Sequence, residues 1–281
     1  MTGLRQRMIR DMELHGLAPG TQQTYVEAVR HLAAHYRRPP DQLSEDEVRD
    51  FFVHLTKVRR LAPSTLRVHL FALKFLFQKT LARPWPVLNL IRAPRPKKLP
   101  EVLSREEVRL LLARVRRPAA RMSLVMMYAC GLRVSEANHL QARDIDSRRM
   151  VVRVRAGKGQ KDRDVPLPRH TLDQLRAYWV QHRPRPPWLF PSNNGLLPLS
   201  SGSARRCLQA AQRGSGITKD VSCHTLRHSY ATHLLEAGVD LRVIQGLLGH
   251  RSLKTTFVYL HLTQSTLQAV HRTVDTLMAN L

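Results

Sequence analysis

The chain has 281 residues, 43% of them hydrophobic, so it can bury one large core or two smaller ones and is not a disordered polymer. Its formal net charge is +25, from 46 Lys and Arg against 21 Asp and Glu spread along the whole chain, which favours a polyanion such as nucleic acid as partner. The 3 cysteines form no C-x-x-C pair and no stretch approaches the roughly 20 apolar residues of a membrane span, which excludes a disulfide framework, a thiolate zinc site and a membrane helix.

Residues 1–90 are predicted to form a small all-α domain that clamps DNA. Helical patterns cover about 3–15, 20–36, 44–55 and 63–79. The third pattern opens at Ser44-x-x-Glu47, a capping box whose side chains satisfy free backbone N–H groups. This domain is too small for elaborate chemistry, but it is basic enough to hold DNA.

Residues 91–102 are predicted to form a basic, proline-rich linker. Five prolines between positions 83 and 100 forbid a continuous helix and favour an extended chain. A linker of this charge could run along a phosphate backbone, although a solvated linker without a ligand is the alternative. Its candidate DNA contacts are Arg92, Arg95, Lys97 and Lys98.

Residues 103–281 are predicted to be mainly helical with a small antiparallel β-sheet. A second capping box, Ser104-x-x-Glu107, opens one helix, and a second apolar helix ends at Gly131. Strand-like segments flank the turn around Lys158. Further helical patterns lie at about 168–182, 200–213, 225–237, 241–248 and 263–278.

Two basic residues in this part could bind an anion. Arg133 follows the glycine turn, and an arginine there can hold two oxygens of one phosphate. Glu136 lies three residues further on the same helical face and could fix that guanidinium, although a purely structural Arg–Glu pair is equally compatible. Lys158 sits at the hairpin tip, where it could reach a ligand or simply be a surface lysine; Lys161 and Arg163 are nearby alternatives.

A histidine and an arginine share the first turn of a later predicted helix. His224 and Arg227 are three residues apart, and the free N–H groups and dipole of a helix N-terminus favour an anion. His228 and His233 follow within the same ten residues, which raises the question of a zinc site. No glutamate lies between His224 and His228 as in H-E-x-x-H and no third ligand is evident, so no metal is predicted.

Two residues near the C-terminus complete the candidate set. His250 follows a helix with Asp240 as its expected N-cap, and it could bind a phosphate oxygen or only cap the helix end. Tyr259 could be a nucleophile or a half-buried aromatic side chain. Two arginines, a lysine and two histidines would bring positive charge and proton donors to one tyrosine hydroxyl, which suits attack on a phosphodiester.

The order and spacing of four motifs resemble the tyrosine recombinase (phage integrase) family, most closely its Xer-like and integrase-type bacterial members. These motifs are GLRVSE at 131–136, GKGQKDRDVPL at 157–167, HTLRHSYATHLLEAGVDLRVIQGLLGH at 224–250 and TTFVYLH at 255–261. The resemblance covers about 110–275, whereas the N-terminal bundle matches only in architecture. It implies an all-α SAM-like core-binding domain followed by an α+β catalytic domain.

The resemblance also implies residue roles. Arg133 and Arg227 match the phosphate clamp, Lys158 the general acid for the leaving 5′ oxygen, and Tyr259 the nucleophile. His224 and His250 match the family's two catalytic histidine positions, and we expect Glu136 to support the clamp. We further expect Lys161 and Arg163 to contact DNA, with no cofactor, metal or ATP required.

The resulting hypothesis is a site-specific DNA recombinase or integrase, with double-stranded recombination sites as its partner. It implies a 3′-phosphotyrosyl intermediate, a Holliday junction and a tetramer whose C-terminal helix, at about 263–278, docks on a neighbouring protomer. A type IB topoisomerase-like enzyme and a catalytically silent DNA-binding protein are the alternatives. The charged N-terminus lacks the apolar core of a signal peptide, so we expect a cytoplasmic, nucleoid-associated bacterial protein, typical of a mobile element.

Overall fold

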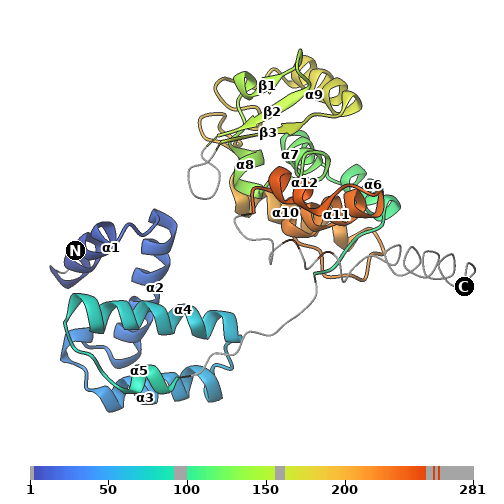
Figure 1. Cartoon of the computed structure of the whole chain (residues 1–281). Coiled ribbons are helices and arrows are strands. Elements are labelled where there is room, and N and C mark those ends of the chain that lie inside the picture. The colour runs from blue at the N-terminus through green and yellow to red at the C-terminus, as the bar shows by residue number, and fades with distance from the viewer. Residues whose placement is uncertain (1–2, 92–99, 156–161, 251–255, 257–258, 260–281) are drawn as a thin grey trace, which may run out of the picture. The chain divides into compact units, whose positions relative to one another are not determined.

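The computed structural model describes residues 3–91, 100–155, 162–250, 256 and 259. The chain divides into two compact units, residues 1–98 and 99–281, which are considered separately (Figure 1). The prediction of a mainly helical fold with a small antiparallel sheet is confirmed. Most of the predicted linker and the predicted helix at 263–278 lie outside the described residues.

The first unit is a helical bundle around a core of leucine, phenylalanine and methionine side chains. Ser44 and Glu47 form the predicted capping box, since each side chain bonds the other residue's backbone N–H. The helices extend beyond their predicted ends in two places, because π-helical turns continue the third and fourth helices. The unit contains α1 (Gly3–Leu14), α2 (Pro19–Tyr36), a 3-10 turn (Pro40–Gln42), α3 (Glu45–Val53), α4 (Pro63–Lys74) and the short α5 (Val87–Leu90), with π-helical turns at His54–Val58 and Phe75–Thr80.

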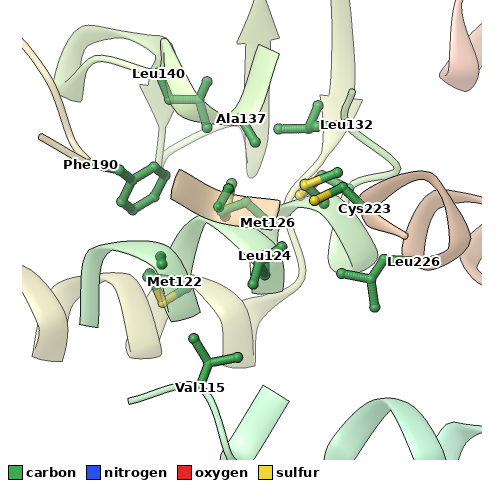
Figure 2. Close-up of a cluster of buried hydrophobic side chains, with 14 of the residues drawn as sticks. Val115, Met122, Leu124, Met126, Leu132, Ala137, Leu140, Phe190, Cys223 and Leu226 are labelled. Atoms are coloured by element: carbon green, nitrogen blue, oxygen red, sulfur yellow. The ribbon is translucent and has the colours of Figure 1, made fainter. Parts of the chain in front are cut away.

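The second unit is built around one central helix, α7 (Pro118–Ala129), which packs against five other helices. Side chains from several of these elements meet in one buried cluster (Figure 2). Two members of that cluster, Leu132 and Leu226, are fully buried and lie next in sequence to candidate site residues. The remaining helices are α6 (Arg105–Ala113), α8 (Val134–Asn138), α9 (Arg169–His182), α10 (Ser201–Arg213), α11 (Cys223–Glu236) and α12 (Leu241–Leu248), with a 3-10 turn at Ala142–Asp144.

The sheet of the second unit has three antiparallel strands in the order β1-β2-β3. β2 (Val151–Val154) and β3 (Arg163–Pro166) pair as predicted, with Val152 opposite Val165. β1 (Ile145–Asp146) is not predictable from the sequence, because two residues are too few to show the alternation of a strand. Within the second unit Figure 1 shows the sheet and α9 on one side of α7 and α11 on the other, while α12 also packs against β3.

The helix starts of the second unit follow their capping chemistry. Ser104 and Glu107 form the second predicted capping box at the start of α6. Asp240 is the N-cap of α12, as predicted, and its carboxylate accepts hydrogen bonds from Arg242 and Val243. Across the described part of the chain, no helix is both long and apolar enough to cross a membrane.

Candidate active site

The candidate site is centred on the carboxylate of Glu136. Its carboxylate is almost fully buried and accepts hydrogen bonds from Arg133 Nη1 at 2.7 Å and from the Arg133 backbone N–H at 2.8 Å. Arg163 forms a second, bidentate pair with it, through Nη1 at 2.9 Å and Nη2 at 2.8 Å. Arg227 lies 3.7 Å from the same carboxylate. Three guanidinium groups therefore surround one carboxylate, which leaves an excess of positive charge for an anion.

The protonation state of Glu136 follows from these contacts. Burial alone would raise its pKa, but hydrogen bonds from Arg163 and from the Arg133 backbone outweigh burial and lower the pKa to about 2. The carboxylate therefore stays ionised at every pH above that value. Because this pKa is depressed, Glu136 contributes stability above its unfolded pKa, near ~4.3, and the contribution is lost as pH falls toward 2.

The same three arginines also converge on the C-terminus of α12. Three successive backbone carbonyls there accept hydrogen bonds: Leu247 from Arg163 Nε at 2.8 Å, Leu248 from Arg227 Nη2, and Gly249 from Arg133 Nη2 at 3.1 Å. The last carbonyls of a helix have no partners within the helix and carry its negative partial charge. The helix end therefore holds all three guanidinium groups in fixed positions, in addition to the carboxylate.

Arg227 is the most deeply placed of the three arginines. Its side chain is 4% exposed, and its Nη1 donates to the carbonyl of Gly131 at 2.6 Å. Burial, and then the neighbouring Arg133, lower its pKa to about 10, so the guanidinium remains charged at neutral pH. Leu226, one residue earlier on α11, is anchored in the hydrophobic core and fixes the helix that carries this arginine.

Gly131 allows the chain to turn sharply before Arg133. Its φ is +61°, and a Cβ at this position would lie 2.5 Å from Cε1 of Tyr230 and 3.2 Å from Cδ2 of Leu248. Only glycine combines this left-handed backbone with the close approach of the tyrosine ring. The turn places Leu132 in the core and Arg133 at the carboxylate.

We expect Gly131→Ala to destabilise the second unit by about 2–4 kcal/mol, because it adds backbone strain and a steric overlap with Tyr230. The free energy of unfolding from urea titration measures this loss. Gly238→Ala is the matched control: φ there is +84°, but a Cβ would meet nothing within 4 Å, so only the strain of about 1 kcal/mol applies. Equal losses in the two variants would contradict the role of the tyrosine contact.

Three histidines of the site are kept neutral by their surroundings. Burial comes first in each case, followed by nearby positive charge, and the pKa falls to about 4 for His228 and for His250. The pKa of His224, in the first turn of α11, is lowered for the same reasons. Neutral imidazoles at pH 7 keep a free lone pair or one N–H to offer a ligand.

Tyr259 lies beside these groups and is only 1% exposed. Its hydroxyl is 3.0 Å from Nδ1 of His228, and its ring stacks against His250 with ring centroids 6.4 Å apart. Burial raises its pKa, while the charges of Arg227 and Arg133 act in the opposite direction. The side chain therefore packs as a core residue and at the same time places its hydroxyl among the site's cations.

The structure brings together five of the six predicted catalytic residues: Arg133, His224, Arg227, His250 and Tyr259. The sixth, Lys158, lies outside the described residues, as do the candidate DNA contacts Arg92, Arg95, Lys97, Lys98 and Lys161. His250 Nδ1 is 3.0 Å from Oγ1 of Thr256, and its backbone N–H bonds Gln245, so this residue also closes the end of α12.

Two residues occupy places that sequence reasoning did not give them. Arg163 does not face outward as the predicted DNA contact would, because its side chain is 11% exposed and its guanidinium is turned inward to pair with Glu136. His228, which the sequence suggests only as a metal ligand, lies with its Nδ1 3.0 Å from the Tyr259 hydroxyl. The sequence does contain one indication that His228 lies at the site, because it directly follows Arg227 on the same helix. Among the described residues, no cluster of three or more His, Cys, Asp or Glu side chains could hold a metal ion.

Family models match most of the chain. Residues 101–266 match the phage integrase family, and residues 4–87 match the phage integrase N-terminal SAM-like domain. A putative integrase/recombinase y4qK from Sinorhizobium fredii is 43% identical over 263 residues, which cover 93% of this chain and 85% of that protein. The match thus spans both units of the structure.

Solved structures show the same fold. A crystal structure of XerA recombinase is 27% identical, with a TM-score of 0.56, and covers 96% of this chain and 97% of that one. The XerH site-specific recombinase, bound to a palindromic difH substrate in a post-cleavage complex, is 21% identical with a TM-score of 0.70. That match covers 89% of this chain and 78% of XerH.

Proposed function

The chain belongs to the phage integrase family of tyrosine recombinases, and from this premise we propose that it cleaves and rejoins DNA through a 3′-phosphotyrosyl intermediate and a Holliday junction. It is a site-specific recombinase in the broad sense that its family defines. The observation that carries the finer proposal is the Tyr259 hydroxyl beside the charges of Arg133 and Arg227. A phenol placed among fixed cations suits attack on an anionic phosphodiester.

In the proposed cleavage step each of these side chains has one chemical role. The phenol of Tyr259 gives its proton to one of the site's neutral imidazoles as its oxygen forms a bond to phosphorus, and the bond from phosphorus to the 5′ oxygen breaks. Arg133 and Arg227 neutralise the charge that grows on the two non-bridging oxygens, which is the work of an oxyanion clamp. Lys158, which matches the family's hairpin lysine, gives a proton to the leaving 5′ oxygen.

Rejoining follows the same path in reverse. The energy of the broken bond is kept in the phosphotyrosyl link, so no ATP is required. The 5′-hydroxyl of a partner strand attacks that link, and exchange of one pair of strands gives a Holliday junction. Because the arginines already supply positive charge at the phosphate, this proposal assigns no role to a divalent metal.

The remaining parts of the chain support an assembly on DNA. The basic first unit matches an N-terminal SAM-like domain and is proposed to clamp double-stranded DNA, while the linker follows the phosphate backbone. XerH was solved on its difH substrate, which supports DNA as the partner here. We propose a tetramer on paired sites, in the bacterial cytoplasm at the nucleoid, with residues 263–278 docking between protomers.

A two-site recombination assay in EDTA tests this function. A plasmid carries two copies of the DNA that flanks the protein's own gene, since recombinases of mobile elements act on neighbouring ends. We expect exchange products and a covalent protein–DNA complex in the absence of free divalent metal. Relaxation without exchange would instead indicate a topoisomerase, binding without cleavage an accessory protein, and inhibition by EDTA a metal-dependent reaction.

A further inference from the structure

Arg163, the first residue of β3, has all three nitrogens of its guanidinium bonded to the protein. Nη1 and Nη2 donate to the two carboxylate oxygens of Glu136 at 2.9 and 2.8 Å, and Nε donates to the carbonyl of Leu247 at 2.8 Å. A Cβ added to Gly249 would lie 3.2 Å from Cδ of Arg163, so the glycine leaves room for this side chain at the end of α12. The guanidinium is therefore turned toward the protein and does not present its paired N–H groups to a phosphate.

The three arginines share the carboxylate of Glu136 unequally. Arg163 bonds both of its oxygens, and this bidentate geometry is among the strongest that a guanidinium can form. The side chain of Arg133 bonds one oxygen, at 2.7 Å, and Arg227 lies 3.7 Å away. Burial acts to raise the pKa of Glu136, and the hydrogen bond from Arg163 is the largest of the effects that lower it. Arg163 is thus the main counter-charge of this carboxylate.

The charge of the cluster shows what this pairing leaves for DNA. Three guanidinium groups and one carboxylate carry two net positive charges. When Arg163 takes up the charge of Glu136, both net charges belong to Arg133 and Arg227, which are proposed to bind the non-bridging oxygens of the phosphate. Without Arg163, the same carboxylate would face only these two clamp arginines and would cancel half of the charge that they hold for the phosphate.

We propose that Arg163 is a positioning residue that neutralises Glu136, so that the carboxylate holds the clamp arginines in place without cancelling their charge on the scissile phosphate. A buried carboxylate needs an opposite charge beside it, and Arg163 supplies that charge from the side away from the phosphate. In this role Arg163 acts through Glu136 and touches no reacting atom. The inference rests on the proposed function, because it requires Arg133 and Arg227 to act on a phosphodiester.

A purely mechanical role for Arg163 is the alternative that the test distinguishes. The residue also joins β3 to the end of α12 through Leu247, and the next two carbonyls there accept hydrogen bonds from Arg227 and Arg133. A mechanical link depends on the several directed hydrogen bonds of an arginine, which neither lysine nor glutamine reproduces. Neutralisation depends on a positive charge beside Glu136, which lysine keeps and glutamine loses.

The measurement is the rate of covalent complex formation in a single turnover at saturating protein. Its substrate is a nicked form of the duplex that the unmodified protein cleaves in the two-site assay. The variants are Arg163→Lys, Arg163→Gln and the double variant that combines Arg163→Gln with Glu136→Gln. The double variant lacks both the cation and the carboxylate, so the net charge of the cluster equals that of the unmodified protein. Thermal unfolding gives the folded fraction by which each rate is divided, and Arg163→Met replaces Arg163→Gln if the latter is unstable.

Arg163→Gln is expected to form the complex about 100-fold more slowly, as for the loss of an oxyanion donor, because Glu136 then cancels one clamp charge. Arg163→Lys should stay within about tenfold of the unmodified rate, the cost of one hydrogen bond to a charged group. Adding Glu136→Gln to Arg163→Gln should make the reaction about tenfold faster, because the two substitutions lie in one network and do not add. A gain of rate from a second substitution is not expected of a mechanical link, since the double variant has fewer contacts.

The matched control is Lys219→Gln. Nζ of Lys219 pairs with the carboxylate of Glu107 at 2.6 Å, elsewhere in the second unit. As with Glu136, burial acts to raise the pKa of Glu107 and the hydrogen bond from its cation lowers it. The control therefore loses the same type of ion pair without touching the clamp. We expect its rate per folded molecule to stay within about threefold of normal, since sites without shared partners act independently.

Three results would overturn the proposal. They are a near-normal rate in Arg163→Gln, a rate in Arg163→Lys as low as in Arg163→Gln, and a double variant that is no faster than Arg163→Gln. The proposed function is tested separately in the same assay. Complex formation by the unmodified protein and its loss in Tyr259→Phe support that function whichever result the Arg163 variants give, whereas no complex with the unmodified protein would count against the function itself.

Discussion

Tyr259→Phe is expected to abolish the covalent protein–DNA complex completely. The substitution removes one oxygen, the one that would bond to phosphorus, and leaves the ring that packs with Ile244 and Leu248. Because that ring is 1% exposed and keeps its packing, the fold should change little, and DNA binding should persist. The measurement is denaturing gel electrophoresis of a nicked suicide substrate, in which the cleaved end diffuses away and the complex accumulates.

Tyr230→Phe is the matched control for this experiment. Tyr230 packs against the same small cluster as Tyr259, and burial raises its pKa to about 12. It is the nearest alternative nucleophile on α11, and the control should form the complex at the normal level. A complex that survives in Tyr259→Phe and disappears in Tyr230→Phe would move the nucleophile to the other tyrosine.

Arg227→Lys is expected to slow cleavage about 10²–10³-fold, the cost of removing one oxyanion donor, which is ~2.7–4 kcal/mol of transition-state stabilisation. The guanidinium bonds two carbonyls, of Gly131 and Leu248, in different directions, and a lysine cannot reproduce this fork. The surroundings lower the pKa of Arg227 to about 10 from an ordinary 12.5. A similar lowering from the ordinary ~10.4 of a lysine would leave it only partly charged near neutral pH.

Arg117→Lys is the control that distinguishes the loss of an arginine's two hydrogen bonds from the loss of the phosphate clamp. Arg117 also bonds two acceptors, Oγ of Ser203 at 3.1 Å and the carbonyl of Pro191 at 2.9 Å, but elsewhere in the second unit. We expect this control to lose some stability and to cleave at the normal rate per folded molecule. Single-turnover cleavage at saturating protein measures both variants, and equal rates in the two would contradict the assignment of Arg227 to the clamp.

Helix positions and helix caps were predictable because they depend on neighbours in sequence. Ser44 with Glu47, and Ser104 with Glu107, form the capping boxes that their spacing indicates, and Asp240 caps α12. The pairing of Arg133 with Glu136 was likewise readable, since residues three apart share a face of a helix. The two-residue strand β1 and the π-helical turns were not, because each is too short to show a repeated hydrophobic pattern of its own.

The contacts that give the site its geometry could not be read from local spacing. Arg163 reaches Glu136 across 27 positions and the carbonyl of Leu247 across 84. From sequence, a basic residue beside a hairpin tip is equally compatible with a surface DNA contact. Its inward direction is set by how β3 packs against α12, which no pattern within either element specifies.

The sequence by itself determined a basic, mainly helical chain whose ordered motifs belong to one family of recombinases, because caps, periodicity and motif spacing are local properties. The tertiary structure decided how these residues act on one another. It places three arginines around Glu136 and the end of α12. It also brings the Tyr259 hydroxyl within hydrogen-bond distance of His228, 31 positions away in the sequence. These contacts depend on the packing of α8, β3, α11 and α12 around a shared core, and only the folded chain fixes that packing.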